Sequence, residues 1–87
     1  MDFTKPIEFS PHAREKMQDR GASREEIERA IRMGDSEPAR KGRLMFRKTF
    51  PYNRRWRGKH YMAKQVAPVV AEEPERWVVV TVYVMYF

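Results

Sequence analysis

Halfway along this chain, the spacing of the hydrophobic residues changes from the helical pattern to the alternation of strands. Ile27, Ala30 and Ile31 share one face of a helix. Further on, Leu44 and Phe46 alternate with polar and basic residues, as in a half-buried strand. A helical part followed by strands predicts an α+β fold, with two helices on one face of a three- to four-stranded antiparallel sheet.

Capping residues delimit the two predicted helices. Ser10 precedes a proline, so the first helix is expected to begin there and to end near Arg20, before Gly21. The sequence Ser-Arg-Glu-Glu from Ser23 is a capping box, which starts a second helix that Gly34 closes. The helical part is therefore predicted to be a short helical hairpin.

The second half of the chain contains three predicted strands. On the last of them, the valines at even positions from Val78 to Val84 predict the buried row, so Thr81 and Tyr83 face the other side. The strands cover residues 44–50, 59–67 and 77–86, with a turn region over 35–42, a loop over 51–58 and a polar connection over 68–75.

Length and composition indicate a single domain over residues 1–87, because a chain of this size supports one modest core. It has no cysteine, which excludes disulfides and thiolate zinc sites and favours a reducing, cytoplasmic location. The start of the chain lacks the apolar run of a signal peptide, and the apolar stretch over 77–87 is too short to span a bilayer. No membrane association is expected.

The positive charge is concentrated in residues 40–66, which hold ten Lys or Arg side chains and no Asp or Glu. Such a segment repels itself unless an anion relieves it, so a polyanionic partner is expected. Arginines bind phosphates and aromatic rings stack on unpaired bases, so their mixture here favours RNA. The alternative is a solvated basic face with packed aromatics. The candidate nucleic-acid-binding residues are Arg43, Arg47, Arg54, Arg55, Trp56, Arg57, Lys59, His60 and Tyr61.

Several side chains are candidates for catalysis on RNA. His12, in the first turn of the first helix, is the preferred proton acceptor, ahead of His60; capping or packing is the simpler role for it. Arg20 is expected to stabilise developing charge, or else to lie at the core edge. Lys64 joins Arg47, Thr81 and Tyr83 on one open surface if its row faces away from the helices.

No metal or other cofactor is expected. The two histidines lie far apart in the sequence, and the basic segment has no carboxylate.

The stretch FSPHAREKMQDRGASREEIERAI, with KQV and VTVY downstream, resembles the bacterial family called domain of unknown function 4258. His12, Ala13, Arg20, Gly21, Lys64 and Thr81 fall on the family's pattern. The resemblance implies the fold of barnase, colicin and RelE-type ribonucleases, many of which are toxins. Two features depart from the pattern: the segment 51–58 is longer and more basic, and the last strand continues to Phe87.

The resemblance and the basic segment together lead to one main hypothesis, a metal-independent ribonuclease toxin in which a 2′-hydroxyl attacks the adjacent phosphate. An acidic antitoxin is its expected inhibitor. The alternatives are a non-catalytic module that binds RNA or DNA in a regulatory or ribosome-associated protein, and a protein that binds an acidic protein surface. The apolar last strand also offers an edge for oligomerisation.

Overall fold

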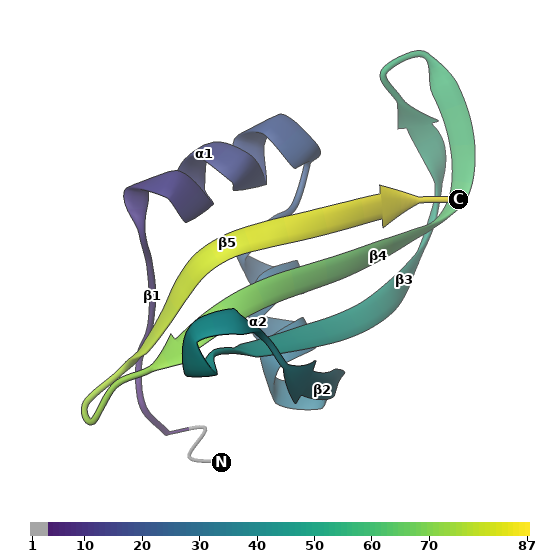
Figure 1. Ribbon diagram of the computed structural model, residues 1–87. Helices are drawn as coiled ribbons and strands as arrows, with labels where there is room; N and C mark the ends of the chain where they lie inside the picture. The colour runs from purple at the N-terminus through teal and green to yellow at the C-terminus, as the bar shows by residue number, and fades with distance from the viewer. Residues whose placement is uncertain (1–3) are drawn as a thin grey trace.

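The computed structural model describes residues 4–87, which form two helices and a five-stranded mixed sheet (Figure 1). This confirms the α+β class. Within these residues, no helix combines the length and apolar character needed to cross a membrane. The elements are β1 (Ile7–Phe9), α1 (Pro11–Arg20), α2 (Arg24–Met33), β2 (Asp35–Pro38), the 3-10 turn η1 (Arg40–Gly42), β3 (Leu44–Trp56), β4 (Lys59–Glu72) and β5 (Trp77–Tyr86).

The sheet has the strand order β1-β5-β4-β3-β2. Strands β2 to β5 are antiparallel neighbours, whereas β1 runs parallel to β5, with Ile7 opposite Trp77. The expectation of three or four antiparallel strands is therefore wrong in number and direction. The added strands are only three and four residues long, too short to show a period of two in the sequence.

The predicted helix ends are confirmed. The Ser10 hydroxyl accepts a hydrogen bond of 3.0 Å from the Ala13 amide, and Gly21 ends α1 in the left-handed conformation with φ 76°. At the start of α2, Ser23 and Glu26 form both hydrogen bonds of the capping box. These local signals are strong because each satisfies amides or carbonyls that a helix end leaves without partners.

One hydrophobic core lies between the helices and the sheet. α1 packs on β5, and α2 packs on β4 and β3. Ile27, Ala30 and Ile31 are buried as predicted, and Trp77 from β5 is only 1% exposed. Removing a buried aromatic side chain of this size typically costs about 3–5 kcal/mol. The core residues are Ile7, Phe9, Ala13, Ala22, Ile27, Ile31, Phe46, Val66, Val70, Trp77, Val79 and Val82.

The side chains of β5 change faces at a β-bulge. The pairing of β5 with β4 shifts between Val69 and Val70, where Val69 lies opposite Thr81 and Val70 opposite Val79. Trp77 and Val79 are buried before the bulge and Val82 after it. The predicted even-numbered buried row is thus wrong for the first half of the strand.

Segment 51–58 continues the strands instead of forming the predicted loop. β3 and β4 form a long hairpin, closed at residues 57 and 58, whose φ angles are 51° and 85°. This two-residue turn uses Arg57 and Gly58 in place of the usual Asn-Gly pair, so it lacks the usual sequence signal of a hairpin turn. A register shift between Pro51 and Arg54 bends the hairpin, with Asn53 at φ 49°.

β4 also runs beyond its predicted end, through Pro68 to Glu72, and the true connection to β5 is short. The ladder to β3 has the same register on both sides of Pro68, with Lys48 opposite Val66 and Met45 opposite Val69. A proline lacks one amide donor but does not otherwise break an extended chain. The predicted turn region over 35–42 contains β2 and η1 instead.

Candidate nucleic-acid interface

The end of the β3–β4 hairpin, residues 51–61, projects past the end of β5 and is called the arm below (Figure 1). It contains four of the ten Lys and Arg side chains of the basic segment, and all four are exposed. They are Arg54, Arg55, Arg57 and Lys59, and Lys64 lies just beyond the arm. His60 on the arm is exposed as well.

Three aromatic rings of the arm surround the ring of Tyr86 from β5. The Trp56 ring stacks on the Tyr86 ring with centroids 5.1 Å apart and an interplanar angle of 14°. Tyr52 meets the Tyr86 ring edge-on at 5.4 Å, and Tyr61 lies against it at 5.4 Å with a tilt of 44°. Aromatic pairs at such distances stabilise each other beyond the area they bury. These contacts hold the arm against the end of β5.

A cation lies over each of the three rings of the arm. The Arg54 guanidinium is 4.8 Å from the Tyr52 centroid and the Arg57 guanidinium is 5.0 Å from that of Trp56. The Lys59 ammonium group is 5.5 Å from the centroid of Tyr61. Cations at these distances are attracted by the negative faces of the rings. Each ring of the arm therefore contacts both a cation and the Tyr86 ring.

The carbonyl groups at the end of α1 bind the arm and its neighbours. Arg57 donates a hydrogen bond to the Asp19 carbonyl, the Tyr86 hydroxyl donates to the Arg20 carbonyl at 2.7 Å, and Lys64 donates to the Gly21 carbonyl. A helix end leaves such carbonyls without intrahelical partners, and its partial negative charge favours cations. The end of α1 is therefore an anchor for the arm.

Gly21 is required at this anchor for two reasons. Its φ of 76° is unfavourable for other residues, and a Cβ atom there would lie 2.6 Å from the Tyr86 hydroxyl and 2.7 Å from the Trp56 ring.

The hydroxyl of Tyr86 is partly removed from water. Burial, followed by the nearby Tyr52 and Glu26, raises the pKa of Tyr86 to about 12.

Lys64 lies on the helix side of the sheet, so it does not share the open surface with Arg47, Thr81 and Tyr83. Its ammonium group forms an ion pair of 2.8 Å with Glu26 of α2, and its side chain is 4% exposed. The register explains the placement, because Lys64 is opposite Tyr86 and shares its face. The prediction that Lys64 shares this open surface is therefore wrong.

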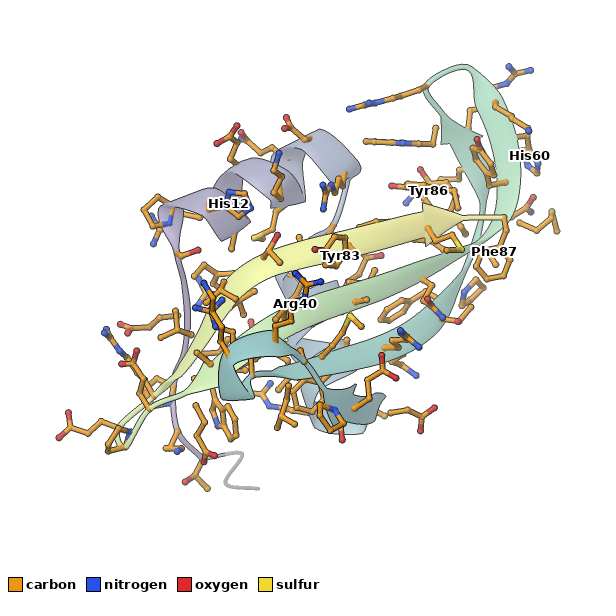
Figure 2. The ribbon with its side chains drawn as sticks, in the orientation of Figure 1. His12, Arg40, His60, Tyr83, Tyr86 and Phe87 are labelled. Carbon is orange, nitrogen blue, oxygen red and sulfur yellow. The ribbon has the colours of Figure 1, made fainter. Side chains whose placement is uncertain are left out.

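Thr81 and Tyr83 do lie on the open face of the sheet, opposite Val69 and Ala67. A hollow lies there between η1 and the strands. Figure 2 labels Arg40 of η1 and Tyr83 on this side. The residues that line the hollow are Pro38, Ala39, Arg40, Arg43, Met45, Val69, Val80, Thr81 and Tyr83.

Arg20 reaches from α1 to the edge of β5. Its guanidinium donates a hydrogen bond of 2.7 Å to the Val82 carbonyl and lies 5.2 Å from the centroid of the Tyr83 ring. This hydrogen bond therefore uses part of the edge of β5, so the Val82 carbonyl already has a partner in the same chain. The expected pairing of β5 with another chain stays a prediction. It applies to the part of β5 that follows Val82.

The two histidines lie on different elements. His12 is exposed in the first turn of α1, and His60 is exposed on the arm (Figure 2). Arg47, on β3, is bound to Glu37 of the neighbouring β2 by an ion pair of 2.7 Å. Of the predicted catalytic residues, the structure thus brings Arg20 and Tyr83 into contact.

Most cations of the basic segment have no acidic partner. Arg47 and Lys64 form ion pairs, and the other eight of the ten form none with any residue in 4–87. These eight lie before β3, within it, and on the arm. They are Arg40, Lys41, Arg43, Lys48, Arg54, Arg55, Arg57 and Lys59.

The family model called domain of unknown function 4258 matches residues 9–84 of the chain. The chain belongs to this family. The match includes both helices and most of the sheet, together with the six residues on which the resemblance was based. Neither the curated proteins nor the solved structures include a significant match.

Sequence reasoning did not identify Arg40 or Tyr86 of this family member as part of a site. Arg40 was counted only as charge, and η1, which brings it to the open face, has no clear sequence signal. Tyr86 lies in an apolar strand more than twenty residues after the arm, so only the sheet register brings the two together. Within residues 4–87, no group of three or more His, Cys, Asp or Glu side chains forms a metal site.

Proposed function

We propose that this protein is an RNA-binding domain that holds its ligand through the basic segment 40–66. The observation that carries the proposal is the set of eight cations there that lack an ion-pair partner within residues 4–87. Outside this segment, acidic residues outnumber basic ones on both sides. A polyanion would relieve the repulsion among the unpaired cations, and a phosphate backbone matches their spread along β3 and the arm.

Binding is favoured over catalysis as the primary function because the predicted catalytic residues lie on two faces. Lys64 is buried against Glu26, so a phosphate would have to displace a carboxylate to reach it. His12 is exposed on α1, outside the hollow that contains Thr81 and Tyr83. RNA binding needs only the exposed cations, and it is compatible with a cytoplasmic protein.

A metal-independent ribonuclease of the RelE or barnase kind is the second candidate. It is favoured by the contact of Arg20 with Tyr83, which brings a guanidinium beside a phenol at the open face. In such a reaction the 2′-oxygen bonds to phosphorus while the bond to the 5′-oxygen breaks. His12 would accept the 2′-hydroxyl proton, and water would protonate the departing oxygen. Arg20 and Arg47 would stabilise the phosphorane charge.

In the ribonuclease hypothesis, Thr81 and Tyr83 orient the phosphate. An acidic antitoxin that covers the open face would inhibit the enzyme, because it would neutralise the same unpaired cations.

The binding proposal is tested by titrating a fluorescent RNA with the protein at several salt concentrations. We expect the logarithm of the association constant to fall steeply and linearly with the logarithm of salt. A shallow slope, or no binding at low salt, would contradict RNA as the ligand. A shallow slope with weak, sequence-blind binding would favour an acidic protein partner instead.

Cleavage is tested separately on a gel, with RNA and the protein in EDTA. The wild type is compared with His12→Ala and Tyr83→Phe. The ribonuclease candidate requires cleavage by the wild type and its loss in both variants, with RNA binding retained. Intact RNA that migrates as a complex with all three proteins would eliminate it.

A further inference from the structure

The rings of the arm have little free surface for a base. Each ring contacts the Tyr86 ring, at centroid distances of 5.1 to 5.4 Å. Each also has a cation over it, at 4.8 to 5.5 Å. A nucleic-acid base stacks only where a ring face is open to it. Stacking on these rings would therefore require the displacement of a cation.

The aromatic rings of the arm position its cations and do not stack on bases. A guanidinium attracted to a ring face keeps N–H donors free at its edges, where they can reach phosphate oxygens. Arg54 forms no ion pair with any residue in 4–87, and Arg57 uses one nitrogen on the Asp19 carbonyl. Long basic side chains lose much conformational freedom when they bind, and an ordered starting position lowers that cost.

We propose that the arm recognises the sugar–phosphate backbone of its ligand, and that Tyr52, Trp56 and Tyr61 position cations instead of stacking on bases. This inference rests on the proposed RNA binding and specifies its ligand chemistry. Double-helical stems bury their base faces and expose their phosphates, so the arm accepts stems at least as readily as unpaired strands. This proposal is the opposite of the preference for unpaired bases that is expected from the sequence.

The test compares strands that differ only in their bases. The wild-type protein is titrated with a uridine strand, with an abasic phosphodiester strand of the same length, and with an RNA duplex having the same number of phosphates. Base stacking contributes enough that its loss weakens binding by about tenfold or more. We expect the abasic strand to bind within about threefold of the uridine strand, and the duplex to bind as tightly or more tightly.

Tryptophan fluorescence provides a second readout. The protein has two tryptophans, and Trp77 is only 1% exposed, so a base can reach Trp56 alone. The fluorescence change should be the same with uridine and abasic strands. A loss of about tenfold in affinity for the abasic strand, with quenching by uridine only, would overturn the inference and leave RNA binding intact.

Variants of equal charge complete the test. Arg54→Gln should weaken binding to all three ligands by a similar factor and lower the salt slope by about one. Arg29→Gln, on the exposed side of α2, removes the same charge outside the arm and should leave the affinities nearly unchanged. Equal effects of the two variants would contradict a role for the arm. Failure of all three ligands to bind the wild type would refute the proposed function itself.

Discussion

The Lys64 ammonium group lies 2.8 Å from the Glu26 carboxylate, beneath the rings of Tyr52 and Tyr86. The pair joins β4 to α2, and Lys64 also binds the carbonyl of Gly21 between the two helices. Glu26 at the same time accepts a hydrogen bond from the Ser23 amide in the capping box. This ion pair therefore connects the sheet, the helix cap and the aromatic cluster.

The Lys64–Glu26 pair should make a large contribution to stability when either partner is removed alone. Lys64→Met leaves a carboxylate without its partner, and losses of about 3–5 kcal/mol are typical for buried pairs. Glu26→Gln keeps the capping geometry and removes only the charge. A double-mutant cycle by urea denaturation should show that the two losses are not additive. Additive losses would show that the pair is not coupled.

Gly21→Ala should destabilise the fold more than Gly42→Ala. Both glycines have a left-handed φ, 76° and 71°, so the backbone cost of roughly 1 kcal/mol is common to both. Only at Gly21 would the new Cβ meet Tyr86 and Trp56, whereas Gly42 has open space. The free energies of unfolding of both variants measure the difference. Equal losses would mean that the arm can move away from Gly21 at little cost.

The raised pKa of Tyr86, about 12, should make stability fall in strongly alkaline solution. The unfolded tyrosine ionises near its usual pKa of about 10, before the folded one does. The contribution of Tyr86 to the free energy of unfolding is therefore complete below about pH 10 and is lost as the pH rises toward 12. Because Tyr86 is partly exposed, the effect is expected to be modest.

The matched comparison for Tyr86 is Tyr86→Phe, which lacks the hydroxyl and its hydrogen bond to Arg20. Denaturation midpoints of the two proteins, measured from neutral to alkaline pH, separate this group from the other tyrosines and lysines. The gap between the midpoints should narrow as Tyr86 ionises. A constant gap would contradict the assigned pKa.

Local signals in the sequence were sufficient to predict the helices. Ser10, Gly21 and Ser23 each satisfy backbone groups within a few residues, so their effect does not depend on the rest of the fold. The same is true of the buried face of α2. The α+β class follows from these helices and from the alternation that begins at Leu44.

The site was less predictable because it depends on registers set by the whole sheet. The bulge at Val80 of β5, opposite Val69 and Val70, changes the faces of β5, and no residue type there signals it. Only the register shows that Lys64 lies opposite Tyr86, on the helix side. The charge of the basic segment was evident from the sequence. The contacts of its aromatic rings with Tyr86 and with the cations were not.

The central claim is that RNA binds to the unpaired cations of segment 40–66, and charge-matched variants test it most directly. One variant combines Arg43→Gln with Arg55→Gln. The other combines Arg14→Gln with Arg29→Gln, on the exposed sides of α1 and α2. Each loses two positive charges, so the net charge is equal.

The decisive measurement is the RNA affinity of these two variants across a range of salt concentrations. The account predicts that the first variant binds about tenfold or more weakly than the wild type, with a salt slope lower by about two, and that the second binds nearly as the wild type does. Equal losses in both variants would contradict it, because binding would then follow net charge and not this segment.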